Sequence, residues 1–265
     1  MKHILLVLLL LFYLNSNAQQ PSASKQVSTF SIEIPQLKTA KKIWVYLPKG
    51  YTTSAKKYPV IYMHDAQNLF DASTSYAGEW NIDETLDSIH AKVIVIGIEN
   101  TENRMEELTP FQHSKYGGGK ADAYLDFIVT TLKPRIDATY RTKTNAKNTA
   151  VFGSSLGGLV SFYAAIKYPE VFGKVGCFSP AFWFNRNEIN DLLAQTKDFD
   201  TKIYFLCGDN EGDADMIPDM KNVEQWVNTK RCECKKLNKE VIVKGGQHNE
   251  KLWREGFKKA YLWLF

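Results

Sequence analysis

The segment Gly153–Gly157 contains the residue best suited to act as a nucleophile. It reads Gly-Ser-Ser-Leu-Gly, and it fits the pattern G-x-S-x-G only with Ser155 at the centre. Residues 149–152 are apolar and typical of a strand, whereas residues 156–167 have an apolar helical face. Glycines on both sides of the serine would permit a strained turn between the two elements. The alternative is an ordinary Gly/Ser turn, but the context favours an exposed nucleophile followed by the N–H of Leu156, which can stabilise negative charge.

A serine nucleophile needs a base, and one histidine of the chain is placed to provide it. The sequence has five histidines, and only His248 follows Ser155. It lies in a Gly-rich loop after the last expected strand, where α/β-hydrolases carry their base. His64 is interpreted as part of a loop, and His90 and His113 as surface residues. The alternative for His248 is also a surface position.

The acid that would orient this histidine is expected in the loop after the strand at residues 202–207. Four carboxylates compete there, Asp209, Glu211, Asp213 and Asp215. The same loop could bind calcium, but it lacks the spacing of a known calcium-binding loop. The residues alone leave the acid unassigned.

The order of strand and helix patterns predicts the fold. From residue 58 onward, apolar strand-like runs alternate with helical patterns, one of which is long and covers residues 120–140. This alternation predicts a mainly parallel central sheet with helices on both faces and with polar loops at the strand ends. Residues 29–34 and 42–47 alternate polar and apolar side chains, which is typical of antiparallel edge strands. We expect one α/β catalytic domain over residues 27–265.

The N-terminus has the pattern of a secretory signal peptide over residues 1–18. A lysine precedes an apolar run, and small and polar residues up to Ala18 resemble a cleavage site. The apolar run is too short to span a membrane comfortably, which disfavours the alternative of a retained anchor. We therefore expect a secreted or periplasmic protein with a flexible lead-in at residues 19–26 and no stable membrane anchor after cleavage.

Charge and cysteine content exclude several classes of protein. The chain has 33 Lys and Arg against 29 Asp and Glu, a net charge of +4 without a basic stripe, so no nucleic-acid partner is expected. Four cysteines form no disulfide framework, and no metal-ligand spacing accompanies Cys232 and Cys234. Cys177 and Cys207 are expected to be buried thiols, although a bridge between them is the alternative. We expect no metal and no organic cofactor.

Several motifs together resemble the esterase-D/enterochelin-esterase-like branch of the α/β-hydrolases. The segments that carry the resemblance cover nearly all of the mature chain and are residues 60–71, 78–83, 133–141, 153–158, 179–183 and 245–248. That branch includes feruloyl and acetyl-xylan esterases, siderophore esterases, S-formylglutathione hydrolases and mycolyltransferases. The resemblance implies the α/β-hydrolase fold and ester chemistry at a serine.

The resemblance also implies roles for two further residues. The acid of the family lies three residues after a glycine that ends the seventh strand, and counting from Gly208 this position is Glu211. The family's Asp-Gly-Gln loop reads Asp-Ala-Gln at residues 65–67, which makes the N–H of Gln67 the expected second donor to the oxyanion. The implied catalytic set is Ser155, Glu211 and His248.

Two tryptophans lie near the loops expected to form the site. Trp80 follows the first of these loops and Trp183 follows the end of another strand. They are candidates to line the substrate pocket, and core packing is an equally good interpretation.

The combined prediction is a serine carboxylic-ester hydrolase that acts through an acyl-enzyme. The expected substrates are small-molecule or glycan-linked esters, either polysaccharide-linked feruloyl and acetyl groups or a siderophore. One alternative is an acyltransferase that uses the same triad with an alcohol in place of water. The other is a carbohydrate- or siderophore-binding protein that keeps the fold without turnover.

Overall fold

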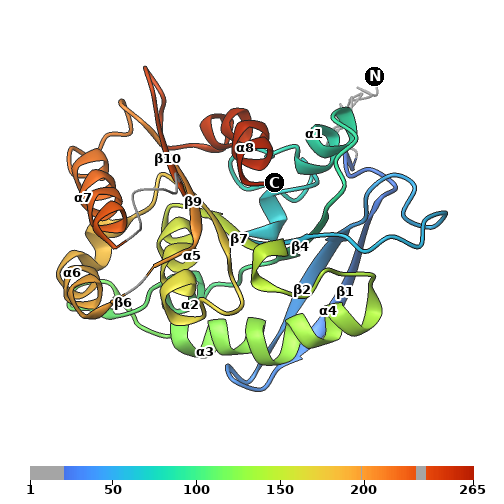
Figure 1. The fold of residues 1–265 in the computed structure, drawn as a ribbon, viewed down its shortest axis with the longest axis horizontal. Helices are drawn as coiled ribbons and strands as arrows, with labels where there is room; N and C mark the ends of the chain where they lie inside the picture. Colours follow the sequence, from blue (N-terminus) through green and yellow to red (C-terminus); the bar gives the residue numbers. More distant parts are fainter. Residues whose placement is uncertain (1–20, 198, 231–236) are drawn as a thin grey trace, which may run out of the picture.

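The computed structural model describes residues 21–197, 199–230 and 237–265. The predicted signal peptide, the first two lead-in residues, Cys232 and Cys234 lie outside these ranges. Eight strands form one sheet in the order β1-β2-β4-β3-β7-β8-β9-β10 (Figure 1). Their bounds are β1 Val27–Ile34, β2 Thr39–Tyr46, β3 Val60–His64, β4 Ile94–Ile98, β7 Thr149–Ser154, β8 Lys174–Phe178, β9 Lys202–Gly208 and β10 Asn238–Val243, while β5 Gln112–His113 and β6 Gly117–Gly118 form a separate hairpin.

Strand direction divides the sheet into two parts. β1 pairs antiparallel with β2, and β2 pairs antiparallel with β4, so one edge is antiparallel. From β4 to β10 every neighbouring pair is parallel. This confirms the predicted α/β fold with antiparallel N-terminal strands, and it places the carboxyl ends of six parallel strands along one edge of the sheet.

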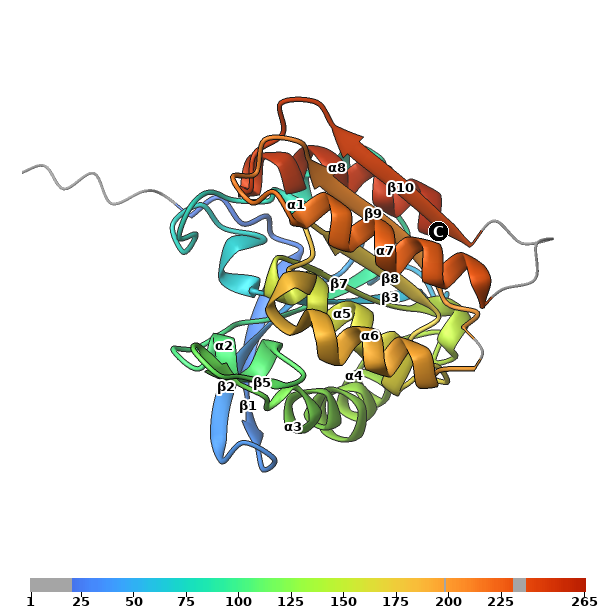
Figure 2. The same cartoon turned by 90° about the vertical axis from the view of Figure 1, so that its left-hand side faces the viewer.

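Helices cover both faces of the sheet. α1 and α8 pack on one face, and α3 to α7 pack on the other (Figure 2). The helices are α1 Ile82–Ser88, α2 Arg104–Leu108, α3 Ala121–Asp126, α4 Lys133–Thr139, α5 Leu156–Lys167, α6 Arg186–Gln195, α7 Met216–Thr229 and α8 Glu250–Leu264, with short turns η1 Ala66–Asn68, η3 Ala146–Asn148 and η4 Phe182–Asn185. Within the described residues, no helix is long and apolar enough to cross a membrane.

The long helical pattern at residues 120–140 is not one regular helix. A π-helical segment, η2 Phe127–Leu132, separates α3 from α4. Pro134 at the start of α4 has no N–H to donate to the turn before it, and the wider π turn accommodates this missing bond. The segment still packs inward, because Phe127, Ile128 and Leu132 are buried.

The core contains the cysteines expected there. Cys177 on β8 and Cys207 on β9 are buried and free. Burial raises the pKa of both thiols. They therefore stay protonated and serve as core packing residues rather than as nucleophiles.

Candidate active site

A strained turn between β7 and α5 presents Ser155. Its backbone has φ 55° and ψ −122°, outside the usual regions for a side-chain-bearing residue. The Ser155 N–H donates to the Phe178 carbonyl at 2.9 Å, which holds the turn against β8. A Cβ atom at Gly153 would lie 2.5 Å from the Gly157 carbonyl. The first glycine of the motif is therefore required for the start of the helix to fold back over the strand end.

Glu211 is the acid that meets His248. Nδ1 of His248 donates to the Glu211 carboxylate at 2.9 Å, and this carboxylate side chain is only 1% exposed. Burial alone would raise the pKa of Glu211, but hydrogen bonds from His248, Ser179 and the Gly208 N–H outweigh burial and lower it. Glu211 is therefore ionised and keeps the proton of the imidazole on Nδ1.

The three competing aspartates make other contacts. Asp209 accepts from the Gly245 N–H, Asp213 accepts from the Asp215 N–H at 2.9 Å, and Asp215 pairs with Arg186 at 2.7 Å. Among the described residues, none of the three bonds to His248. The geometry therefore agrees with the choice of Glu211 that the resemblance implied.

Two residues that the sequence did not single out support this pair. The Ser179 hydroxyl donates to Glu211 at 2.6 Å, and Nε1 of Trp253 donates to the Ser179 oxygen at 2.9 Å. The Trp253 ring also stands at 89° to the His248 ring, with 5.1 Å between the centroids. Ser179, just after β8, thus contacts the acid, and Trp253 on α8 contacts both Ser179 and the base.

One cavity of about 770 Å³ brings the predicted groups together. It is lined by Ser155, His248 and Gln67, and by ten further residues, most of them polar. No hydrogen bond joins Ser155 to His248 in the described residues, and in an unliganded hydrolase this contact is often long until substrate binds. Among the described residues, Nε2 of His248 has no hydrogen-bond partner, which leaves it available as a base.

The expected oxyanion donors lie at two helix starts. Gln67 is in η1, and Leu156 is the first residue of α5. Within the described part of the chain, neither N–H has a hydrogen-bond acceptor. Gln67 lines the cavity; Leu156 is not among the lining residues but directly follows Ser155. Unsatisfied N–H groups at these two positions could stabilise an oxyanion between them.

A salt bridge that the sequence did not predict braces the loop that bears Gln67. Arg104 donates to both oxygens of the Asp65 carboxylate, at 2.7 and 2.8 Å, and the Asn100 amide donates to one of them. Burial would raise the pKa of Asp65, but the Arg104 guanidinium and the Asn100 amide hold it below its usual value. Asp65 has a left-handed backbone, with φ 58° and ψ 45°. The brace therefore holds a strained residue two positions before Gln67.

His64 is the last residue of β3 rather than part of a loop. Its Nδ1 lies 2.8 Å from the Tyr124 hydroxyl, and burial lowers its pKa to about 4. It is therefore a neutral, buried residue, and it lies beneath Gly157 at the start of α5.

The structure does not bring the two tryptophans to the cavity. Trp80 is 3% exposed and packs on Phe178 and Trp253 beneath the site. Trp183 is partly buried and packs on Tyr116 and Phe184. Trp80 is therefore a core residue, whereas Trp183 packs against the outside of the core.

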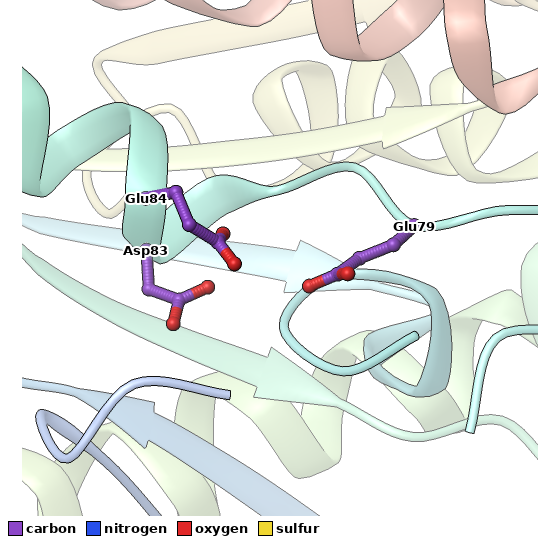
Figure 3. A group of neighbouring side chains, drawn as sticks. All are labelled: Glu79, Asp83 and Glu84. Atoms are coloured by element: carbon purple, nitrogen blue, oxygen red, sulfur yellow. The ribbon is translucent and has the colours of Figure 1, made fainter. Parts of the chain in front are cut away.

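An acidic cluster lies at the start of α1 (Figure 3). Glu79, Asp83 and Glu84 have carboxylate oxygens within 4.8 Å of one another, and among the described residues they are the group close enough to hold a metal ion. Such an oxygen set would suit calcium or magnesium. In the absence of a cation, burial and then the neighbouring Asp83 raise the pKa of Glu84 to about 7, so a proton on Glu84 would relieve the repulsion between the carboxylates.

This cluster also anchors the start of the described chain. Ser22 donates its hydroxyl to Glu79 at 2.9 Å, and the Ser24 N–H donates to Asp83 at 2.7 Å. The described part of the expected flexible lead-in is therefore bonded to the domain.

Comparison with known proteins agrees with the fold and with ester hydrolysis. A model of the family described as Putative esterase matches residues 34–264. The chain is 28% identical to the uncharacterized protein YbbA of Bacillus subtilis over 242 residues, which is 85% of this chain and 92% of the relative. It is 27% identical to an endo-1,4-beta-xylanase/feruloyl esterase of Xylanibacter ruminicola over 200 residues, which is 71% of this chain but 25% of that protein.

A solved structure shares the architecture. The enterobactin esterase FES of Shigella flexneri, in the presence of enterobactin, matches with a TM-score of 0.74 and 20% identity, over 92% of this chain and 60% of that one. The residues that the family model matches include the strained turn at Ser155, the loop that carries Glu211 and the loop that carries His248. The chain belongs to the Putative esterase family of the α/β-hydrolases and is a carboxylic ester hydrolase.

Proposed function

We propose that the ester hydrolysis proceeds through an acyl-enzyme on Ser155. Nε2 of His248 takes the hydroxyl proton, and the serine oxygen attacks the ester carbonyl. The protonated imidazole then gives this proton to the leaving alcohol, and water activated by His248 releases the acid. The single observation that carries the proposal is the Glu211–His248 hydrogen bond at the cavity that Ser155 lines.

The oxyanion would be held by the N–H groups of Leu156 and Gln67. The N–H of Leu156 is held by the strained turn at Ser155, and the loop of Gln67 is held by the Asp65–Arg104 salt bridge. Donors fixed in advance need no reorganisation when charge develops on the carbonyl oxygen, and this is where such sites gain most of their rate.

The polar cavity supports a hydrophilic ester as substrate. Asn68, Thr74, Ser75 and Asn100 offer hydroxyl and amide groups around the reacting serine. Such walls suit an acyl group linked to a sugar or to a siderophore, and a feruloyl esterase is among the relatives. We place the protein outside the cytoplasm because residues 1–18 have the pattern of a signal peptide.

Hydrolysis assays on three esters test the proposal. p-Nitrophenyl acetate, methyl ferulate and a catecholate siderophore ester should be compared for wild type and Ser155→Ala. The variant should lose on the order of 10⁶ in kcat with its fold intact. The neighbouring Ser154→Ala is the matched control and should keep most of the activity.

Addition of an acceptor alcohol separates water from alcohol as the second substrate. The proposal expects free acid as the main product at every acceptor concentration. Ser155→Ala activity near that of wild type would refute the nucleophile, whereas ester exchange as the main reaction would identify an acyltransferase.

A further inference from the structure

A second cavity lies at the amino ends of the parallel strands, whereas Ser155 follows the carboxyl end of β7. Its walls come from the segments before the parallel strands: Pro59 precedes β3, Lys92 precedes β4, Asn148 precedes β7, and Lys174 begins β8. Ser155 and His248 follow the carboxyl ends of their strands. The two cavities therefore share no lining residue and are separated by the length of the strands.

Lysines dominate the walls of this second cavity. Its volume is about 630 Å³, and none of its lining residues is an aspartate or glutamate. We call it the lysine cavity. Its lining lysines are Lys49, Lys56, Lys57, Lys92, Lys143 and Lys174. The whole chain has nearly balanced charge, with 33 basic and 29 acidic residues, so this separation of charge is local.

Most of these lysines have no carboxylate partner. Lys49 pairs with Asp87 at 3.1 Å. In the described ranges, the other five form no ion pair within 4.0 Å. Burial, followed by the nearby lysines Lys202, Lys147 and Lys143, lowers the pKa of Lys174 to about 8. Among the described residues, only the Asp87 side chain forms an ion pair with one of these lysines, so the cavity has a positive potential.

The C-terminal end of α8 does not account for this group of charges. A helix end attracts one or two cations, and Lys202 fills that role by donating to the Trp263 carbonyl. Lys202 is not part of the lysine cavity. Lys56, Lys57 and Lys143 are on loops, and no described carboxylate or helix end binds them.

We propose that the lysine cavity binds an oligosaccharide that carries several carboxylate groups. A single small anion would leave most of 630 Å³ empty, so the ligand must have a sizeable body as well as charge. Phe265 is 37% exposed and contributes ring surface beside the lysines, and sugar rings pack on such surfaces. The hollow shape disfavours a membrane surface. The inference concerns binding alone and does not depend on the ester chemistry.

Calorimetric titration of the full chain at low salt tests the inference. Trigalacturonate is the probe, and neutral xylotriose is its uncharged counterpart. The cavity variant is Lys56→Gln/Lys57→Gln/Lys143→Gln, whose three side chains are exposed and free of ion pairs. The matched control, Lys239→Gln/Lys258→Gln/Lys259→Gln, removes the same charge elsewhere on the exposed surface.

The expected result is binding of trigalacturonate that weakens with salt and falls by about tenfold or more in the cavity variant only. Xylotriose should not bind. All three proteins should hydrolyse p-nitrophenyl acetate equally, which separates this test from that of the ester site. The inference is overturned if trigalacturonate does not bind, or if both variants bind it equally. Binding of inorganic phosphate or anionic vesicles without trigalacturonate also overturns it.

Discussion

Glu211 and Glu84 are two glutamates in the same domain whose pKa values move in opposite directions. Burial would raise both. Glu211 receives hydrogen bonds from His248, Ser179 and the Gly208 N–H, and its pKa falls. Glu84 lies beside Asp83 and Glu79, and its pKa rises to about 7. Burial raises the pKa of both carboxylates, and the hydrogen-bond donors around Glu211 are what reverse this effect there.

The two kinds of carboxylate differ in where they lie: those held ionised by donors are at the proposed site, and those with raised pKa values hold the structure. Asp65 behaves like Glu211, because Arg104 and Asn100 surround it with donors. Both of these charged carboxylates lie next to groups proposed to be catalytic. The cluster of Glu79, Asp83 and Glu84 instead holds the start of the described chain through Ser22 and Ser24.

The largest expected difference between the two kinds of carboxylate is in catalysis. Glu211→Gln should lower kcat by on the order of 10⁴, because the imidazole loses the partner that fixes its tautomer. Glu84→Gln should leave kcat within about twofold of wild type, since its carboxyl contacts no catalytic group. Steady-state kinetics on p-nitrophenyl acetate measures both. The comparison fails if one of Asp209→Asn, Asp213→Asn or Asp215→Asn shows the large loss instead.

A smaller effect is expected from the Asp65 brace. Arg104→Met should lower kcat by about 10²-fold with little change in KM, because a loosened loop misplaces the Gln67 N–H in the transition state. Arg104→Lys should recover part of the loss, since it restores one charged contact. If Arg104→Met instead raises KM and spares kcat, Arg104 binds substrate and does not position the oxyanion donor.

The smallest effect is on stability and its dependence on pH. A pKa raised in the folded state means that the native protein binds the proton more tightly than the unfolded chain does. The free energy of unfolding should therefore fall as pH rises from about 4.5 to about 7. Glu84→Gln should remove this contribution, so that the variant melts higher than wild type at pH 8 and equally at pH 4.

Glu224 provides a control for that measurement, because burial and Glu240 raise its pKa to about 7 as well. Glu224→Gln should remove a separate part of the same slope. A Glu84→Gln variant that is less stable than wild type at pH 8 would show that the ionised carboxylate has a partner, such as a bound cation.

Local patterns in the sequence were sufficient for the parts of the site that depend on neighbouring residues. The strand, the two glycines and the helix around Ser155 all lie within twenty residues of one another, and together they predict the strained turn that presents Ser155. The fold followed from the alternation of strand and helix patterns. The assignment of Glu211 among four acidic residues needed the family resemblance, because local sequence does not show which carboxylate reaches His248.

The contacts that join distant segments had no local signal. Ser179 and Trp253 are 74 positions apart, and Asp65 and Arg104 are 39 apart. The position of Trp80 after a loop makes it a candidate for the pocket, yet it packs beneath the site on Phe178. Aromatic residues near a strand end can face either the core or the cavity, and only the packing of the neighbouring helix α8 decides between them.

Trapping of the acyl-enzyme tests the central claim most directly. Wild-type protein should be mixed with p-nitrophenyl acetate, quenched in acid within milliseconds, digested and analysed by mass spectrometry. We predict a burst of p-nitrophenol together with one acetyl group on the peptide that contains Ser155, and neither in Ser155→Ala. Acetylation of another residue with the same burst, or steady turnover by Ser155→Ala at the wild-type rate, would contradict the mechanism.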